Sequence, residues 1–329
     1  MTTLTISIPT FNRANLIGET LNSILGQISD EMRPRIEILI SDNASTDKTP
    51  EVIENYRQRH PEIISYYRNQ ENVGFSPNVN LSVQRARNEF SLIMSDDDCL
   101  EDNALADILQ ALDMHPDVGL LLTQYRTWDR TLSTVLDTPP TGPDRYYPNG
   151  IIYFTEKKGA FTPALISGFV FRKCCWTEAQ PELYTDINSI HFILGPLVLA
   201  KHACLDLRSR PLIKYRADMG HWSIETDPTY PFPMFVSYLK GCRAVKSIFP
   251  AKTYQLLYCT TIRTTIGHAI RNKVLGLPFP KSRILEMLTP YFDTTSIRTR
   301  LYTSIFLLIS TLPRWTLYVP FRWLVPKKL

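Results

Sequence analysis

Three consecutive aspartates, Asp96, Asp97 and Asp98, close the apolar run Phe90–Ser95. Adjacent carboxylates repel one another unless a cation compensates their charge, so such a run costs stability when nothing binds to it. Carboxylate oxygens are also the ligands that Mg²⁺ and Mn²⁺ prefer. The run therefore predicts a divalent metal site. The competing interpretation is a solvated acidic turn before a helix that begins near Asn103.

Polar residues also follow two other predicted strands. The strand from Leu4 stops at Pro9, and the apolar run Ile36–Ser41 delivers Asp42 to its carboxyl end. An aspartate there can accept a hydrogen bond from the edge of a nucleotide base. Further on, Gly74 gives a turn with room for a ligand to approach the backbone. The alternative for Asp42 and the loop after it is that they only cap the next helix.

The elements that position these residues alternate between strand and helix. Apolar residues recur at helical spacing from Ile17 to Ile28, and the run Ile36–Ser41 is continuous enough for a strand that is covered on both faces. The order predicts an α/β fold of Rossmann type with a mostly parallel sheet, in which ligands bind beyond the carboxyl ends of the strands. The predicted strands are Leu4–Ile8, Ile36–Ser41, Ile64–Tyr67, Phe90–Ser95 and Val118–Thr123, and the predicted helices span 17–28, 50–59, 78–87 and 103–115.

Four segments stand in a fixed order at these strand ends. They are Ile8–Arg13 (IPTFNR), Ser41–Asp47 (SDNASTD), Asn72–Phe75 (NVGF) and Ser95–Asp98 (SDDD). Together they resemble the pattern of glycosyltransferase family 2, and the resemblance covers about residues 1–125 closely. It implies a GT-A fold and a nucleoside-diphosphate-sugar donor. It also implies a divalent metal, Mn²⁺ or Mg²⁺, that balances the charge developing on the diphosphate.

The resemblance further assigns roles to single residues. It places Asp42 at the base, Asp96 near the ribose and Asp98 on the metal, with Asp96 as a second metal ligand. Arg13 is a candidate partner for phosphate, although an exposed arginine at the start of a helix is the more frequent case. The other residues expected to line the donor are Pro9, Thr10, Asn12, Asn72, Gly74 and Asp97.

The second half of the chain departs from the family pattern. Many inverting members carry an acidic pair after the acceptor loop, commonly Glu-Asp, that takes the proton of the acceptor hydroxyl, and this chain has no such pair. It has instead the segments Leu183–His191 (LYTDINSIH) and Pro211–Trp222 (PLIKYRADMGHW). This arrangement loosely resembles the O-antigen abequosyltransferases, bacterial enzymes that move a 3,6-dideoxyhexose from a CDP donor to a lipid-linked oligosaccharide.

The stereochemical outcome stays open at this point. Transfer with retention needs no general base, whereas transfer with inversion requires Asp186 or His191 to accept the proton. Asp218 is a further catalytic candidate, and His191 is also a candidate ligand for metal or phosphate. The structural alternatives are a buried His191 before an apolar helix and an Asp186 that caps that helix.

A donor domain over residues 1–225 and a helical region with proline breaks over 226–329 are expected. The stretch Asp137–Gly150, rich in Pro and Tyr, predicts a long loop, either an acceptor lid or plain surface. Near the end, Pro313 interrupts an apolar run before it is long enough to span a bilayer. Aromatic and basic residues follow, so 305–329 predicts either contact with a membrane surface or packing on the protein.

Composition sets the remaining limits. The 36 Lys and Arg against 32 Asp and Glu give a net charge of +4, too balanced for nucleic acid as the main partner. The six cysteines show no zinc-type spacing, which favours a reduced, cytoplasmic protein. The N-terminal residues lack the basic leader and long apolar run of a signal peptide. A location at the inner face of a bacterial plasma membrane, peripheral to it, is expected.

Two other functions compete with a glycosyltransferase. A sugar nucleotidyltransferase is expected to carry a glycine-rich phosphate loop after the first strand, and Pro9–Arg13 is not such a loop. A non-catalytic protein that binds nucleotide sugars would not need to keep Asp96 and Asp98. A metal-dependent glycosyltransferase in the synthesis of a bacterial surface glycan, such as the O-antigen of lipopolysaccharide, is therefore the leading hypothesis.

Overall fold

The chain divides into two compact units, each described here by itself. The computed structural model describes residues 1–159, 165–187, 189–217, 232–275, 277, 279–293 and 295–313. The first unit comprises 1–150, 162–186 and 201–219, and the second comprises 151–161, 187–200 and 220–329. The domain boundary expected after residue 225 lies outside the described residues and stays a prediction, but two segments before it group with the helices that follow.

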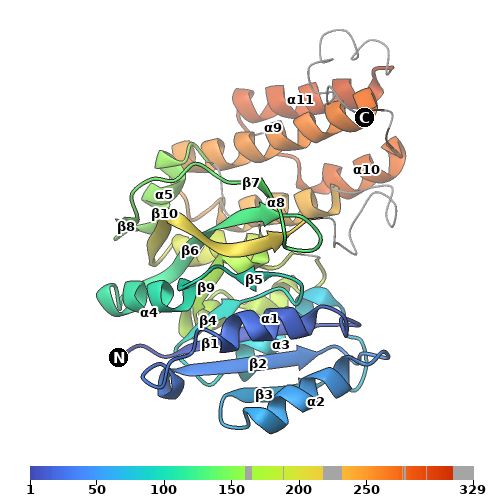
Figure 1. Ribbon diagram of the computed structural model, residues 1–329. Helices are drawn as coiled ribbons and strands as arrows, with labels where there is room; N and C mark the ends of the chain where they lie inside the picture. Colours follow the sequence, from blue (N-terminus) through green and yellow to red (C-terminus); the bar gives the residue numbers. More distant parts are fainter. Residues whose placement is uncertain are drawn as a thin grey trace. The chain divides into compact units, whose positions relative to one another are not determined.

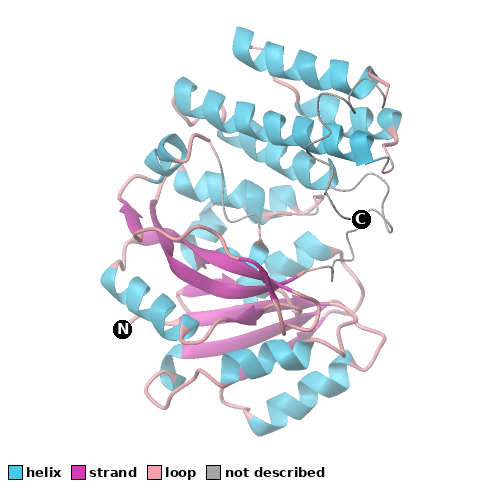
Figure 2. Cartoon of the chain, turned by 45° about the horizontal axis from the view of Figure 1, so that its top comes forward, coloured by secondary structure: helices cyan, strands magenta, loops and turns pink. Residues whose placement is uncertain are grey.

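The first unit is built on one mixed sheet (Figure 2). The strand order is β3-β2-β1-β4-β9-β6-β10-β5, with β7 paired to β6 and β8 paired to β10. Strands β3, β2, β1 and β4 are parallel, as are β6 and β10, whereas β9 runs antiparallel between β4 and β6. The strands are β1 Leu4–Thr10, β2 Ile36–Asp42, β3 Ile64–Arg68, β4 Phe90–Ile93, β5 Cys99–Leu100, β6 Val118–Trp128, β7 Val135–Asp137, β8 Arg145–Tyr147, β9 Phe169–Arg172 and β10 Ala203–Arg216.

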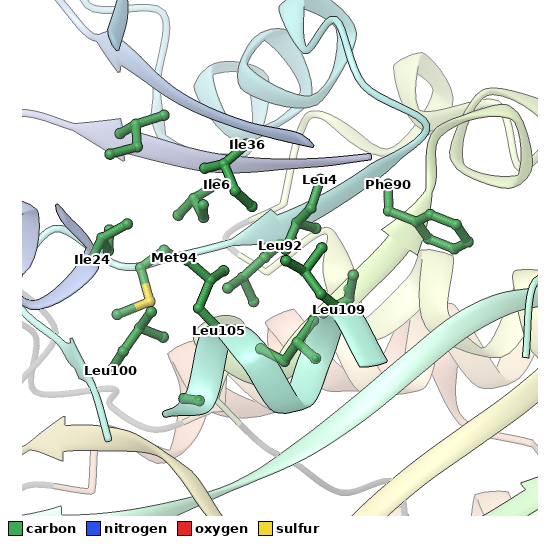
Figure 3. Packing of buried hydrophobic residues seen from close by; sticks show 14 of the residues in the cluster. Leu4, Ile6, Ile24, Ile36, Phe90, Leu92, Met94, Leu100, Leu105 and Leu109 are labelled. Atoms are coloured by element: carbon green, nitrogen blue, oxygen red, sulfur yellow. The ribbon is translucent and has the colours of Figure 1, made fainter. Parts of the chain in front are cut away.

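Helices cover both faces of the parallel strands (Figure 1). One buried cluster joins α1, α2 and α4 to β1, β2 and β4, and Figure 3 shows Leu105 and Leu109 of α4 against Ile6 and Leu92. Helix α3 packs on β1 and β2 from the other face. The helices of this unit are α1 Ile17–Leu25, α2 Thr49–Arg59, α3 Phe75–Arg85, α4 Ala104–Met114 and α6 Lys173–Glu178, with short 3-10 turns at Arg33–Arg35, Ile166–Gly168 and Pro181–Tyr184.

In strand β1, apolar and polar residues alternate, but the polar residues are not exposed to solvent. Its apolar residues Leu4, Ile6 and Ile8 join the cluster, and its polar residues are buried as well. The Thr5 hydroxyl donates to Glu37 Oε2 at 2.7 Å, and the Ser7 hydroxyl contacts the Ser82 carbonyl of α3 at 3.3 Å. Because these polar groups have partners, they can be buried at little cost.

The predicted α/β fold is confirmed, and several elements differ in detail. Strand β6 continues to Trp128, five residues beyond its predicted end, and β4 ends at Ile93. The expected loop Asp137–Gly150 contains β8, whose Tyr147 is opposite Cys204 of β10. That part of the loop prediction is wrong because a three-residue edge strand is stabilised by pairing and carries little sequence pattern of its own.

The second unit is helical in its described part. Its helices are α5 Gly150–Glu156, α7 His191–Leu199, α8 Phe232–Val245, α9 Ala251–Leu275, α10 Lys281–Leu288 and α11 Ile297–Thr311. The Lys273 ammonium of α9 donates to the carbonyls of Ile309, Ser310 and Leu312, which fixes the end of α11 and complements its dipole. Among the described residues, no helix is long and apolar enough to cross a membrane.

The buried Asp293 joins α9 to the segments that follow α8 and precede α11, and it predicts a pH dependence of stability. Burial alone would raise the pKa of Asp293, but hydrogen bonds from Tyr254, Thr295 and Lys246 lower it to about 2. Because the folded pKa is below the unfolded value of 3.8, the stabilisation is complete above that value and is lost as the pH falls toward 2. We expect Asp293→Asn to lower the free energy of unfolding by about 1–3 kcal/mol at pH 7 and to flatten its dependence below pH ~4. Urea unfolding followed by circular dichroism at several pH values measures both, and an unchanged acid slope would contradict the assignment.

Candidate functional site

The acidic run lies at the carboxyl edge of the parallel strands. Strand β1 ends at Thr10 opposite Asp42, the last residue of β2. Strand β4 is the other parallel neighbour of β1, and the turn Ser95–Asp98 follows it. Parallel strands bring their carboxyl ends to one edge of a sheet, so the topology gathers three of the predicted segments there.

Arg13 joins the β1 segment to the acidic turn. Its Nε lies 3.2 Å from Asp96 Oδ1 and its Nη2 lies 3.4 Å from Asp97 Oδ2. Burial and then the neighbouring Asp97 raise the pKa of Asp96 to about 6, whereas Arg13 and the Thr10 hydroxyl act in the opposite direction. The alternative of an exposed arginine at a helix start does not hold, because this side chain is 13% exposed and already neutralises part of the acidic charge.

Asp98 has a different environment from its two neighbours. Its side chain is fully buried, its Oδ2 accepts a hydrogen bond from Ser167 at 2.6 Å, and its Oδ1 accepts one from the Arg216 backbone amide at 3.1 Å. Burial and then the charge of Asp97 raise the pKa of Asp98 to about 8, while the two hydrogen bonds lower it. The Ser167 hydroxyl oxygen also accepts a hydrogen bond from the Ser95 backbone amide at 3.0 Å. Asp98 thus ties the acidic turn to the segment before β9 and to β10.

The Arg216 side chain reinforces the same junction. Its Nε donates to the Asp97 carbonyl at 2.9 Å, its Nη1 to the Arg130 carbonyl at 2.8 Å, and its Nη2 to Glu19 Oε2 at 2.6 Å. The residue is only 3% exposed. A buried guanidinium with every branch engaged holds the backbone of the acidic turn against β10.

Asp42 is buried and supports the loop that follows β2. Its Oδ1 accepts the Ser45 amide at 2.9 Å, its Oδ2 accepts the Tyr66 hydroxyl at 2.9 Å, and Arg68 Nε lies 3.4 Å away. Burial and the bond to Asp42 raise the pKa of Tyr66. A carboxylate with these partners shapes the edge of the site, and direct contact with a base would have to use the remaining lone pairs.

Asn12 and Asn72 organise the loops around it. Asn12 has a left-handed backbone with φ 55°, and its Oδ1 accepts the Thr46 amide at 2.8 Å. Asn72 Oδ1 accepts the Gly74 amide at 2.9 Å and the Asn43 side-chain amide at 2.7 Å. Gly74 has φ 92°, a conformation that side chains rarely adopt, so a residue with a Cβ would be strained there. Pro9 is the residue of β1 before Thr10.

Of the three catalytic candidates, the structure describes Asp186 and His191. Asp186 is exposed in the turn after Pro181–Tyr184, and the N-cap of α7 is Ile190, so Asp186 does not cap that helix. His191 begins α7 in the second unit and is buried beside Phe192, with the ring centres 4.1 Å apart. Burial lowers the pKa of His191 to about 3. Asp218 lies outside the described residues.

The residues of the acidic turn fit a hard divalent cation in their chemistry. Asp96 and Asp97 present carboxylate oxygens that are held close by Arg13, and such oxygens suit Mg²⁺ or Mn²⁺. The described residues contain no group of three or more side chains arranged to hold a metal by themselves. Two carboxylates suffice where diphosphate and water complete the shell. Both carboxylates accept hydrogen bonds, but the Asp97 side chain is 13% exposed whereas Asp98 is fully buried, so burial favours Asp97 over Asp98 as the first ligand.

Several supporting residues could not be found from the sequence. Ser167 lies 69 positions from Asp98 and Arg216 lies 118 positions from it. Tyr66 and Arg68 are part of β3, where they look like ordinary strand residues. Asn43 lies within the segment Ser41–Asp47. Its position directly after Asp42 is the sequence signal that could have identified it as a supporting residue.

Comparison with known proteins agrees with this arrangement. The family model "Glycosyl transferase family 2" matches residues 5–172. The abequosyltransferase RfbV of Salmonella typhimurium strain LT2 is 36% identical over 140 residues, which cover 39% of this chain and 41% of that protein. A GalNAc(5)-diNAcBac-PP-undecaprenol beta-1,3-glucosyltransferase of Campylobacter jejuni is 34% identical over 111 residues, 33% of this chain and 34% of that protein. The chain thus matches less than half the length of these relatives.

Solved structures match over nearly the whole chain. TarS 1-349 of S. aureus in complex with UDP-GlcNAc superposes with a TM-score of 0.70 at 15% identity, covering 98% of this chain and 92% of that one. The mannosyltransferase PcManGT of Pyrobaculum calidifontis, in complex with GDP-Man and Mn²⁺, gives a TM-score of 0.52 at 17% identity, covering 94% and 86%. At these identities the likeness concerns the fold, and the fold is that of GT-A glycosyltransferases. With more than half of its length matched by the family model, this chain belongs to glycosyltransferase family 2.

Proposed function

We propose that the protein transfers a sugar from a nucleoside-diphosphate donor to a saccharide acceptor in the synthesis of a bacterial surface glycan. The observation that carries the proposal is the Arg13 bridge to Asp96 and Asp97 at the carboxyl edge of the parallel strands. It sets a cation and two carboxylates next to Thr10, where a nucleoside diphosphate and its metal need both charges.

Each side chain of the edge has a proposed part in donor binding. Asp97 and Asp96 hold the divalent ion, which when bound balances the charge of the leaving diphosphate. Asp96 also takes the ribose, and Arg13 takes a phosphate oxygen. The loops around Asn12, Asp42 and Asn72 to Gly74, with Pro9 and Thr10, line the nucleoside. Asp98 acts through the turn that it anchors, without touching the donor.

In the reaction the bond between the anomeric carbon and the diphosphate oxygen breaks, and the nucleoside diphosphate leaves with the electron pair. A bond forms to an acceptor hydroxyl, whose proton must be taken up. His191 suits that task least, because a pKa near 3 makes it a weak base. Asp186, which is exposed, and Asp218 stay the candidates for transfer with inversion, and retention would need neither.

The relatives suggest which donor and acceptor to test first. The similarity to an abequosyltransferase favours a CDP-3,6-dideoxyhexose such as CDP-abequose. The glucosyltransferase named for an undecaprenol-linked substrate favours a lipid-linked acceptor, as in O-antigen assembly. We therefore place the enzyme at the cytoplasmic face of the plasma membrane, peripheral to it.

A nucleotide-binding screen tests the donor site. We expect one of UDP, GDP, CDP and dTDP to raise the melting temperature of the purified protein, and CDP to do so if the donor is a dideoxyhexose derivative. A ligand at about 100 times its dissociation constant stabilises the folded state by roughly 2.7 kcal/mol. The shift should require Mn²⁺ or Mg²⁺ and should disappear in Asp97→Asn.

Activity assays on the same purified protein, together with the screen, separate the competing functions. Hydrolysis or transfer of the sugar nucleotide would exclude a non-catalytic binding protein. Formation of sugar nucleotide from a nucleoside triphosphate and a sugar phosphate would indicate a nucleotidyltransferase instead. If no nucleotide shifts the transition with either metal, the proposed donor site is wrong.

A further inference from the structure

The two units carry opposite net charge, a division that the balanced total conceals. The second unit has 17 Lys and Arg against 5 Asp and Glu, a net charge of +12. The first unit has 19 Lys and Arg against 27 Asp and Glu, a net charge of −8. A compact body with this excess of positive charge attracts anionic surfaces within about a Debye length and repels a second copy of itself.

Helix α11 of the same unit presents an apolar stripe to solvent. Ile297 is 84% exposed, and Leu301 and Leu308 are each 57% exposed. Residues three or four positions apart lie on one face of a helix, so these three, with Ser304 between them, form one outward stripe. Leu307 borders it, and the Arg300 side chain is exposed next to Leu301. We call Ile297, Leu301 and Leu308 the α11 stripe.

The stripe belongs to a well-fixed helix. Ser296 and Thr299 form a capping box at its start, and Lys273 holds the carbonyls at its end. Its opposite face is buried in the unit. The buried residues of that face are Thr299, Thr303, Phe306, Ile309 and Ser310. Three large aliphatic side chains are therefore held in water by a helix that cannot easily rotate to hide them.

We propose that the α11 stripe docks this protein on the surface of an anionic lipid bilayer. A soluble polyanion would neutralise the charge of the second unit but would leave the α11 stripe exposed to water. A second copy of the protein would bury the stripe but would bring together two units that each carry a net charge of +12. An anionic bilayer satisfies both, because its headgroups neutralise the cations while its acyl boundary receives the aliphatic side chains. This proposal rests on the proposed function, because docking on a bilayer would give the enzyme access to a lipid-linked acceptor.

Vesicle co-sedimentation of the full chain tests the proposal. We expect binding to phosphatidylcholine vesicles that contain phosphatidylglycerol, weak binding to phosphatidylcholine alone, and a fall in binding as salt is raised. The double variant Leu301→Gln/Leu308→Gln should reduce the partition coefficient by about tenfold or more, since it removes aliphatic surface without changing charge. The matched control is Met114→Gln in the first unit, where Met114 is 65% exposed, and this variant should bind vesicles like the wild type.

Three outcomes would overturn the proposal. Binding that is equal with and without phosphatidylglycerol would remove the role of charge, and equal binding by the double variant would assign membrane contact to another part of the chain. A concentration-dependent dimer in light scattering that the double variant abolishes would show that the stripe meets a second copy. Nucleotide binding in solution, measured on the same variants, should be unchanged, so failure here is distinguishable from failure of the proposed donor site.

Discussion

Asp97→Asn should lower the Mn²⁺-dependent affinity for the stabilising nucleoside diphosphate by about 100-fold or more. The reason is that an amide keeps the shape of the side chain but removes the negative charge and one of the ligand oxygens that a hard cation requires. Asp97 is the suitable target because its side chain is 13% exposed and its carboxylate is bound, among the described residues, by the side chains of Ser95 and Arg13 alone. Isothermal titration calorimetry with nucleotide and metal measures the loss.

Asp98→Asn is the paired variant. Asp98 is enclosed by Ser167 and the Arg216 amide, so its replacement should cost about 1–3 kcal/mol in the free energy of unfolding through impaired hydrogen bonds. Its effect on nucleotide affinity should be clearly smaller than that of Asp97→Asn. The opposite ranking, with Asp98→Asn abolishing metal-dependent binding and Asp97→Asn tolerated, would restore Asp98 as the metal ligand and refute the assignment made from burial.

Arg216→Met should destabilise the protein by about 2–4 kcal/mol, the largest stability loss that we expect from a single side chain of the site. The substitution leaves the carbonyls of Asp97 and Arg130 without the donors that now satisfy them, and it removes a guanidinium whose residue is only 3% exposed. Glu19 is 52% exposed and can be hydrated, so the loss of its ion pair contributes little. Denaturant unfolding, analysed with a common slope, gives the value.

The matched control for this variant is Arg210→Met on the same strand. Arg210 pairs with Asp107 at 2.5 Å, but the two side chains are 37% and 41% exposed. An ion pair with that exposure contributes about 0–1 kcal/mol. If both variants lose the same amount of stability, the enclosed hydrogen bonds of Arg216 do not hold the turn in the way inferred here.

Prediction from sequence succeeded where the pattern is local. The apolar stripe from Ile17 to Ile24 and the continuous run of β2 identify their elements because burial on one helical face or on both strand faces leaves a periodic record. The segments Ile8–Arg13, Ser41–Asp47 and Ser95–Asp98 were correctly placed at or just after the ends of strands. Parallel topology then brings them to one edge of the sheet without any further information.

What failed depends on contacts between distant parts of the chain. Strand β10 is parallel to β6 and antiparallel to β5 and β8, and the residues of β10 alone do not predict these partners. The difference in burial among the three aspartates depends on this pairing. Asp98 is enclosed because Arg216 of β10 and Ser167, both distant in sequence, hydrogen-bond to its carboxylate. Three identical side chains in a row cannot be told apart by sequence alone, so the assignment of the metal to Asp98 rests on family resemblance and stays a prediction.

The interleaving of the two units has a consequence for how the protein can be made. The chain passes between the units five times, and the second unit draws on residues 151–161 and 187–200 as well as on the C-terminal part. A ribosome that has finished residue 216 has supplied every described strand of the sheet. At that point α7 still lacks α8, on which it packs, and α5 still lacks Phe249 and Thr253, which Phe154 and Thr155 contact. A gene fragment cut after the sheet would therefore encode apolar helices without partners. Neither unit can be inherited, exchanged or expressed as one contiguous piece of sequence.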